Sequence, residues 1–421
     1  MNRQLIRPVI FLLAAIAALG ACTFVFNPYG DYEPYEPTTE ASGTLPVVSI
    51  ITKYGKQVKS KREPVEALLY VDVPEGYVSF NGATALRPMA DVPLTVKGRG
   101  NASWKLDKKP YKLRFSESTA LLGMRGNRHF ALIPFAVGRL TWLGTAAGME
   151  AARQLGMGWT PRLEPCELVM NGRYLGLYFA VETVRVDKSR VDVRPGGSPD
   201  SPADCGWLVE IDNYSAPNQL TVAERPGEKL RLTYKEPGTL DRLQADWLAE
   251  QFAEMNHLIY SGEGWEEYID LRSAARYLIV QELLHNTDGY NGSMYLHRRA
   301  GSDARWHFGP VWDLSMTAKR DWVMNDHPSD ASVHWVKPML KSAAFRRAVA
   351  DEWARYLTLD AEVIAAAERL AALCAAADRL NGDLWPQYED GDTDAKLALF
   401  RSTYAANRAW LTARFAARHR E

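Results

Sequence analysis

Two acidic residues in the second half of the sequence occupy positions suited to metal-dependent chemistry. Asp313 lies in Gly309–Leu314 (GPVWDL), at the end of an apolar run, so packing on both sides restrains its backbone. Asp288 comes 25 residues earlier, in Asn286–Tyr290 (NTDGY), and a strand-like segment at 293–298 separates the two. Mg²⁺ prefers hard oxygen ligands, usually one or two carboxylates plus substrate phosphates. The pair suits phosphoryl transfer, one carboxylate orienting a hydroxyl and the other holding metal, although Asp before a turn is also a common turn former.

A glycine-rich loop in the first half of the sequence could hold an anion. Gly98–Trp104 (GRGNASW) lies between two strand-like segments, and Lys109 and Lys112 follow it on the returning strand. Protein kinases cover nucleotide phosphates with such a loop and hold them with a lysine. Glycine lets backbone N–H groups approach an anion closely. Many ordinary hairpins contain Gly-x-Gly, and the sequence leaves open which lysine is used.

Composition sets limits on the class of protein. The chain has 421 residues, 47% hydrophobic and 24% charged, which indicates a globular protein of one large or two ordinary domains. The formal net charge of −1 gives no reason to expect a nucleic-acid partner. The four cysteines have no metal-binding spacing, and whether Cys166 and Cys205 form a disulfide stays open.

The N-terminus has the features of a targeting segment. Arg3 and Arg7 precede an apolar run over 9–21 that is too short to span a bilayer. The run ends in Leu19–Cys22 (LGAC), which resembles a bacterial lipobox, in which the cysteine is acylated and becomes the new N-terminus. We therefore expect a signal peptide over 1–22, a lipidated Cys22, a flexible tether over 23–44 and a location in the cell envelope, on the outer membrane or cell surface in a Gram-negative cell. The alternative is an ordinary secretory signal cut just before the cysteine.

The hydrophobic pattern predicts an α+β protein. Strand-like segments dominate up to residue 234, and Asn171-Gly172 between two of them is a strong hairpin signal. Amphipathic helices dominate from residue 240, except for the segment at 293–298. Helical segments are expected over 140–155, 243–258, 268–284, 345–357, 361–380 and 394–418, with Asp270 as an N-cap.

The order of the motifs resembles the spore coat protein H (CotH) kinase family from about residue 45 to residue 317. The matching segments are Leu45–Ile50, Lys97–Trp104, Lys108–Leu113, Leu121–Met124, Asn171–Tyr178, Glu182, Leu208–Asp212, Asn286–Tyr290 and Gly309–Asp313. The resemblance implies an atypical protein-kinase-like fold, with a β-rich N-terminal lobe and a largely helical C-terminal lobe. Residues 45–317 would form the kinase-like domain, and 318–421 a helical extension packed on it.

The resemblance also implies a set of site residues. Asp288 would be the catalytic acid, and ATP with Mg²⁺ or Mn²⁺ would donate its γ-phosphoryl group to a Ser or Thr hydroxyl of an unidentified protein. Asp313 would bind the metal, with Asn291 and Ser293 nearby. The residues expected to contact the nucleotide are Gly98, Arg99, Gly100, Asn101, Ser103, Lys109 or Lys112, and Glu182.

Several positions depart from the family pattern. Ser315 stands where family members commonly carry a second acid, and Ser293 where they carry Asn. Gly138 and Leu143-Gly144 replace an acidic residue and an Arg-Asn pair. These losses favour an alternative, a catalytically degraded surface scaffold that binds protein or glycan, as does the scarcity of ATP outside the cytoplasm. Its candidate contacts are Trp104, Trp142, Trp159 and Trp306. A phosphotransferase acting on a small molecule or sugar is a third possibility.

Overall fold

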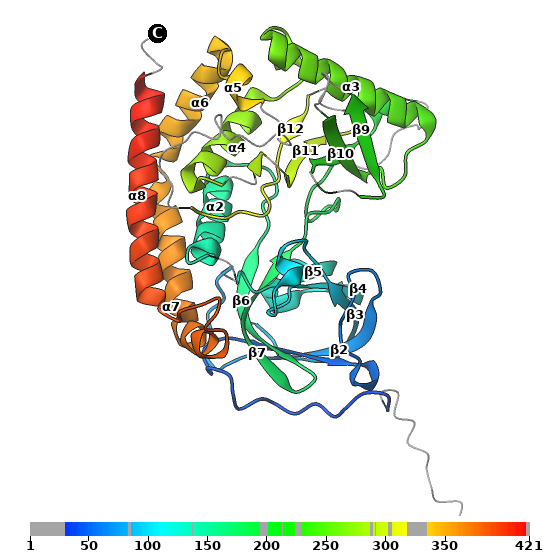
Figure 1. Cartoon of the computed structure of the whole chain (residues 1–421), viewed down its shortest axis with the longest axis vertical. Coiled ribbons are helices and arrows are strands. Elements are labelled where there is room, and N and C mark those ends of the chain that lie inside the picture. The colour runs from blue at the N-terminus through cyan, green and yellow to red at the C-terminus, as the bar shows by residue number, and fades with distance from the viewer. Residues whose placement is uncertain are drawn as a thin grey trace, which may run out of the picture.

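Two β-sheets and a set of long helices make up the computed structural model of the chain (Figure 1). This architecture confirms the α+β class. The structure describes residues 30–82, 86–136, 138–193, 201–212, 214, 216–223, 229–286, 289–290, 292–301, 305–317 and 335–417.

The first sheet closes into a barrel instead of forming an open β-rich lobe. Its strands are β1 (Val47–Thr52), β2 (Val65–Asp72), β3 (Met89–Gly98), β4 (Tyr111–Thr119), β5 (Asn127–Ile133), β6 (Leu163–Met170) and β7 (Arg173–Glu182). Their order is β1-β2-β3-β4-β5-β7-β6, and β1 closes the ring by pairing in parallel with β6. Full closure removes exposed sheet edges, which otherwise invite pairing with other chains.

Alternation along the strands separates the barrel interior from its outer face. Leu113 and Phe115 of β4 are fully buried in the barrel core, whereas Lys112 and Arg114, which alternate with them, point outward. The predicted hairpin at Asn171-Gly172 joins β6 to β7, with both residues at positive φ. The Asn171 side-chain oxygen also accepts a hydrogen bond from the Thr52 N–H at 2.8 Å. The turn residue therefore ties the hairpin to β1.

The second sheet lies in the C-terminal half, so this half is less purely helical than expected. Its strands, in the order β12-β11-β8-β10-β9, are β8 (Trp207–Ile211), β9 (Gln219–Ala223), β10 (Lys229–Glu236), β11 (Met294–Arg298) and β12 (His307–Phe308). One face contributes Val209, Ile211 and Leu296 to the main hydrophobic core, together with Phe252 from the covering helix. The other face carries Glu210 and Tyr295, directly opposite each other on neighbouring strands.

Each predicted helical segment corresponds to a helix in the structure, and one further short helix at 336–339 was not predicted. They are α2 (Thr141–Leu155), α3 (Arg242–Ser261), α4 (Leu271–Leu284), α5 (Val336–Met339), α6 (Ala343–Tyr356), α7 (Asp360–Leu384) and α8 (Thr393–Ala417). Asp270 caps α4 as predicted, accepting the Ser273 N–H at 2.7 Å, and Gly156 ends α2 in a left-handed conformation. No helix in these residues is long and apolar enough to cross a membrane.

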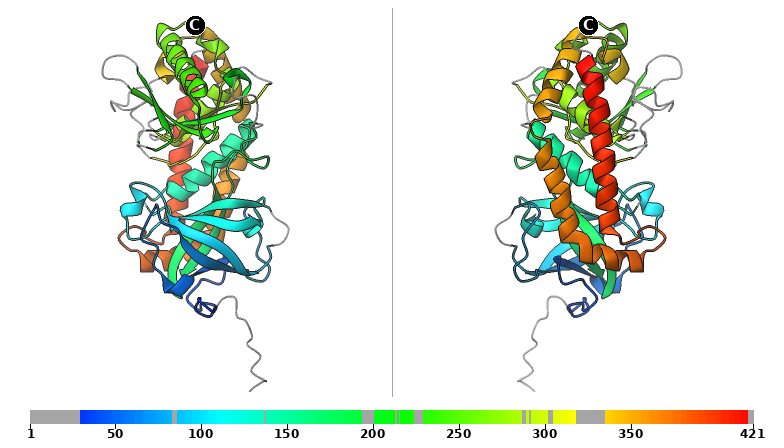
Figure 2. Two further views of the ribbon diagram at one scale, coloured as in Figure 1. Left: turned by 90° about the vertical axis from the view of Figure 1, so that its right-hand side faces the viewer. Right: turned by 90° about the vertical axis from the view of Figure 1, so that its left-hand side faces the viewer.

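The C-terminal helices join the barrel to the rest of the chain. Helix α7 packs along α2 and reaches strand β7 of the barrel (Figures 1 and 2). Asn381 near its end accepts hydrogen bonds from the Leu177 N–H at 3.1 Å and from the buried Lys108 ammonium. Trp385 donates its indole N–H to the Leu175 carbonyl at 3.0 Å. Residues after 335 are thus part of the same core as the preceding sequence.

The segment expected to be a flexible tether lies along the barrel from residue 30 onward. The Tyr35 ring stacks on Tyr70, with centroids 4.2 Å apart, and its hydroxyl bonds to Asp72. Ser42 donates its hydroxyl to Glu167 at 2.6 Å. The segment has no helix or strand, as predicted, but specific side chains dock it. From residue 30 onward, the segment is therefore docked on the barrel and is not a free tether.

Several side chains lie elsewhere than the scaffold interpretation requires. Trp142 and Trp306 are at most 2% exposed and belong to the main core, so they are unavailable as surface contacts. Cys166 and Cys205 are free, and they lie in the barrel core and the main core respectively. The structure therefore shows no disulfide between them.

A buried ionic cluster between α7 and α8 generates the first prediction. The Lys396 ammonium lies 2.7 Å from Asp378 and 3.0 Å from Glu389, and the Lys396 and Asp378 side chains are fully buried. Asp378→Ala should cost about 3–5 kcal/mol in the free energy of unfolding, because it leaves the buried ammonium under-compensated. Urea denaturation measures this loss.

The control breaks an exposed pair between the same two helices. Glu368→Ala removes the partner of Arg401, and both side chains are largely exposed. The expected loss is at most about 1 kcal/mol. Equal losses in the two variants would show that the buried cluster contributes nothing special.

Candidate active site

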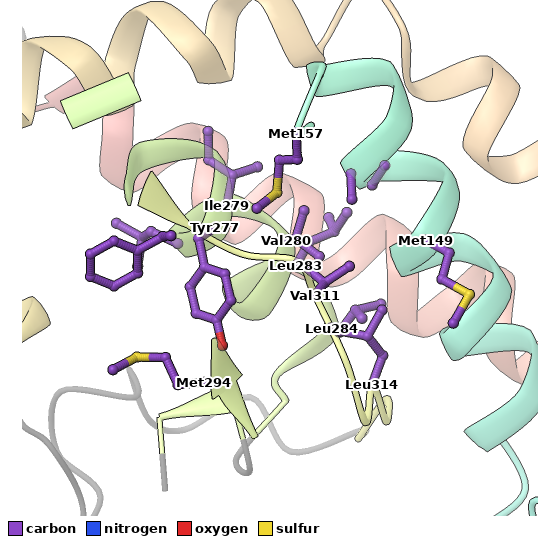
Figure 3. Packing of buried hydrophobic residues seen from close by; sticks show 14 of the residues in the cluster. Met149, Met157, Tyr277, Ile279, Val280, Leu283, Leu284, Met294, Val311 and Leu314 are labelled. Atoms are coloured by element: carbon purple, nitrogen blue, oxygen red, sulfur yellow. The ribbon is translucent and has the colours of Figure 1, made fainter. Parts of the chain in front are cut away.

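Asp313 is exposed but has a tightly restrained backbone. Its φ of 53° is in the left-handed region, which residues other than glycine rarely adopt. Such a conformation persists only where the surroundings determine it. Val311 and Leu314 on either side are buried and lie beside Leu284 of α4 (Figure 3). The carboxylate therefore projects from a fixed point, as the sequence predicts.

Hydrogen bonds from two helices hold the same loop. The side-chain amide of Asn286, just after α4, donates to the Asp313 carbonyl at 3.4 Å. Ser315 donates its hydroxyl to the Asn286 side-chain oxygen at 3.0 Å. The Thr145 hydroxyl of α2 lies 2.6 Å from the Leu314 carbonyl. Ser315, in place of a second acid, thus engages Asn286 and helps to position Asp313.

The other residues that depart from the family pattern lie near the start of α2 and have packing roles. A Cβ on Gly144 would overlap the Cβ of Met316, so only glycine lets α2 approach the loop this closely. Leu143 is fully buried in the main core, and Gly138 has a φ of +88° just before the helix. The polar groups expected here are replaced by residues that fit α2 against the Asp313 loop.

The glycine-rich loop is compact and is held in place by hydrogen bonds. A Cβ on Gly98 would overlap the Trp104 ring, and Gly100 has a φ of +78° close to the Ser103 hydroxyl. Lys61 donates its ammonium to the Gly100 carbonyl at 2.9 Å and to the Asn101 side-chain oxygen at 3.0 Å. The glycines are thus required by the loop itself, whether or not it binds a ligand.

Arg99 connects the glycine-rich loop to the Asp313 loop. Its guanidinium carbon lies 5.6 Å from the centroid of the Trp312 ring, within cation–π range. Burial lowers the pKa of Arg99, while the nearby Asp313 and Tyr295 act in the opposite direction. Residues 214 positions apart in the chain thus meet where the barrel faces the second sheet.

Lys112 lies among other cations on the same side of the barrel. Burial lowers its pKa to about 8, and the positive charges of Arg185, Lys97, Arg99 and Lys235 add to this effect. No carboxylate in the described part of the chain forms an ion pair with it. A half-buried ammonium surrounded by like charges is suited to an anionic ligand.

Lys109 and Glu182 lie elsewhere. Lys109 donates to the Trp104 carbonyl at 2.9 Å, and its ammonium lies over the Trp104 ring. Glu182 is 1% exposed and accepts the Arg162 N–H at 3.1 Å. It is paired with Phe130, whose side chain points into the barrel, whereas Lys112 faces outward. Glu182 and Lys112 therefore lie on opposite faces of the sheet.

Three expected site residues, Asp288, Asn291 and Cys22, are outside the described residues. The neighbours of Asp288 are anchored, since the Tyr277 hydroxyl donates to the Gly289 carbonyl at 2.6 Å. Ser293 is half-buried, and its φ of 55° is also in the left-handed region. The described neighbours of Asp288 are thus held from α4.

The second sheet supplies polar groups that sequence reasoning did not assign to the site. Glu210 forms an ion pair with Lys235 at 2.6 Å, and burial raises its pKa. Burial also raises the pKa of Tyr295, beside Glu210, Asp212 and Asp313. Side chains alternate between the two faces of a strand, so Glu210 of β8 lies on the face away from the apolar core. This alternation was the sequence signal that could have identified Glu210 as a site residue.

A cavity of about 550 Å³ opens beside the segment that leads into the Asp313 loop. Its lining includes Trp159, Arg299, His307 and Gly309-Pro310. His297, which also lines it, has a pKa lowered to about 4 by burial, so its imidazole is neutral at physiological pH. Trp159 is thus the one tryptophan of the scaffold interpretation that lines this cavity.

The donor groups fit a metal held together with a ligand better than an all-protein metal site. No cluster of three or more His, Cys, Asp or Glu suited to a metal occurs among the residues the structure describes. Asp313 offers an exposed carboxylate beside cations that attract phosphate. Mg²⁺ is commonly bound by one or two carboxylates and substrate phosphates, so this arrangement is compatible with it.

Comparison with known proteins identifies one family. The family model described as CotH kinase protein matches residues 96–411, which is about three quarters of the chain. The match starts later than the resemblance seen in the sequence and continues through the C-terminal helices. No curated protein matches the chain.

The contact at Gly144 generates a stability prediction. Gly144→Ala should lower the free energy of unfolding by about 1–3 kcal/mol, because the new methyl group overpacks against Met316. Gly158→Ala is the matched control, since a Cβ there meets nothing within 4 Å. Urea denaturation compares them, and equal stability would show that the α2 contact is not tight.

The environment of Lys112 generates a pH prediction. Its pKa is about 8 in the folded state and 10.5 normally, so the charged form opposes folding below pH 8. That cost disappears as pH rises from 8 to 10.5, so wild-type stability should gain from this group over that window. Lys112→Met should therefore be more stable than wild type by roughly 1–3 kcal/mol at pH 7, and the difference should shrink by pH 10. A difference that does not change with pH would contradict the assignment.

Proposed function

The chain belongs to the CotH kinase family, and from that premise we propose that it is a lipid-anchored envelope kinase. The proposed reaction transfers the γ-phosphoryl group of ATP to a Ser or Thr hydroxyl of a protein. The observation that carries it is that Arg99 of the glycine-rich loop lies over Trp312 and beside Asp313, while Lys112 lies in the same group of cations as Arg99. Cations that can hold phosphates and a carboxylate that can hold a metal are two parts that phosphoryl transfer requires.

In this proposal, one group of residues binds the nucleotide and another binds the metal. Arg99, Lys112 and the backbone N–H groups of Gly98–Ser103 would hold the phosphates, with the barrel as the nucleotide lobe of a kinase-like fold. Asp313, with Asn291 and Ser293 as further candidates, would hold Mg²⁺ or Mn²⁺. The bound metal would neutralise charge on the phosphate oxygens.

The chemical step needs a base and an acceptor. Asp288 would accept or orient the proton of the acceptor hydroxyl. The hydroxyl oxygen then forms a bond to the γ-phosphorus as the bond to the bridging oxygen breaks, so that ADP leaves. The restrained Asp313 backbone favours catalysis because a positioned group needs little reorganisation during the reaction.

The proposed anchor fits the docked N-terminal segment. Asp31, nine residues after Cys22, accepts a hydrogen bond from the Tyr54 N–H just after β1. Nine extended residues span at most about 32 Å. A lipidated Cys22 would therefore keep the barrel near the membrane surface.

A second candidate is a binding scaffold that does not use nucleotide. Its support is that Ser315 is engaged with Asn286, and that Trp159 lines a cavity beside the Asp313 loop. A protein or glycan segment would then bind at this cavity. The two candidates differ in their response to ATP and metal.

Thermal unfolding of the full chain with ATP and Mg²⁺ or Mn²⁺ separates the candidates. A ligand that binds only the folded state adds about 2.7 kcal/mol at a hundredfold excess over its dissociation constant. We expect stabilisation that needs both nucleotide and metal, and that is lost in Asp313→Asn. Asp351→Asn, an exposed acid on α6, is the control and should respond like wild type. No stabilisation of wild type would favour the scaffold.

A further inference from the structure

The outer face of the barrel carries a group of cations that extends beyond the proposed nucleotide site. Lys97 of β3 lies directly opposite Lys112 of β4, and Arg114 occupies the next outward position along β4. Arg185 follows β7 and affects the pKa of Lys112. We call these four residues the cationic patch. Arg114 and Arg185 are exposed, and Lys97 and Lys112 are half-buried.

The patch is electrostatically unfavourable without a ligand. Like charges directly opposite on neighbouring strands destabilise a sheet. No ion pair links any of the four to a carboxylate within the described ranges, although Asp187 acts on the pKa of Arg185. His129, opposite Arg114 on β5, has its pKa lowered to about 4 by burial and by the surrounding Arg and Lys charges. The barrel therefore concentrates positive charge that a partner can neutralise.

Arg114 and Arg185 add more positive charge to the patch than the binding of a nucleotide requires. Arg99, Lys112 and a metal ion already compensate the phosphates in the proposed site. Arg114 and Arg185 continue the positive charge from Lys112 along the exposed barrel wall, near His129. Their exposure on an open strand face is suited to a polymer lying across the surface instead of an enclosed small molecule.

The spacing of the patch indicates the shape of this partner. Lys112 and Arg114 are alternate residues of one strand, so they are about 6.6 Å apart along it. Alternate side chains of an extended peptide have the same spacing and point the same way. Acidic residues at every second position of an extended segment would thus face successive cations of β4.

We propose that Arg114 and Arg185 bind an acidic segment of the protein acceptor, with Asp or Glu residues near the hydroxyl that receives the phosphoryl group. The role of this segment as a substrate rests on the proposed kinase function. Its binding requires only the patch and can be measured without nucleotide. Lys97 and Lys112 extend the contact toward Arg99 and Lys235.

A labelled Ser-Glu repeat peptide tests the binding. We expect fluorescence anisotropy to show binding to the full chain that weakens with salt, and weaker binding of Ser-Lys and Ser-Gly repeats. Arg114→Ala/Arg185→Ala should lower the affinity about fivefold to tenfold. No preference of wild type for the acidic peptide would overturn the proposal.

The control removes the same net charge elsewhere on the barrel. Arg87 and Arg173 are exposed and lie outside the patch, and Arg173 belongs to the β6–β7 hairpin. Arg87→Ala/Arg173→Ala should leave the affinity within about twofold of wild type, because separated charges are screened by salt. An equal loss in both double variants would mean that net charge alone drives binding, which also overturns the proposal.

A nucleotide arm separates this inference from the proposed function. In Arg114→Ala/Arg185→Ala, stabilisation by ATP and metal should persist, while the KM for phosphorylation of the acidic peptide should rise with little change in kcat. Acidic-peptide binding by a wild type that shows no nucleotide response would support the patch and reject the kinase function. A nucleotide response without acidic-peptide binding would reject the patch alone.

Discussion

The fit of helix α2 against the Asp313 loop is the constraint on which the candidate site depends. Gly144 lets the helix meet Met316, and a Cβ on Gly148 one turn later would lie 2.5 Å from Leu284 and 2.8 Å from Leu314. Any larger side chain at these positions would push the loop away from α4. Because α2 also packs along α7, the position of the Asp313 carboxylate is determined by the same core that supports the barrel.

Local charge in this protein differs sharply from its overall charge. The formal net charge of −1 describes a nearly neutral chain, yet the outer wall of the barrel gathers cations with few acidic partners. Exposed acids on the barrel strands interact elsewhere, Glu66 with Lys53 and Asp91 with Tyr70. Composition therefore gives no information on whether one face attracts anions, since that depends on which strands become neighbours.

Sequence periodicity predicted the structural features that depend on neighbouring residues, and it missed those that depend on residues far apart in the chain. The hairpin at Asn171-Gly172, the cap at Asp270 and the helix bounds follow from near neighbours, and the structure confirms them. Closure of the barrel depends on β1 pairing with β6, more than a hundred residues later. Strand β9 also escaped prediction, because Gln219–Ala223 is short and only partly apolar.

The same limit explains the site residues. Asp313 was predictable because the apolar residues on both sides of it mark a restrained loop. The inward orientation of Glu182 depends on its register with Phe130 across β5 and β7, and a strand end alone does not reveal it. The sequence alone suggests that Lys108 is a surface lysine, yet its side chain is fully buried. Its ammonium donates a hydrogen bond to Asn381, which comes 273 residues later.

Arg99 gives the proposed site a way to couple nucleotide and metal. Without ligands its positive charge lies beside Asp313 and over Trp312, so the carboxylate has a partial counter-charge. A bound phosphate would attract the same guanidinium and leave Asp313 freer to bind a cation. A metal at Asp313 would in turn repel Arg99 toward the phosphate. Each ligand then strengthens the binding of the other by the same factor, as linkage requires. In the proposed site, one arginine just after β3 would then be enough to make the two sides of the site act together.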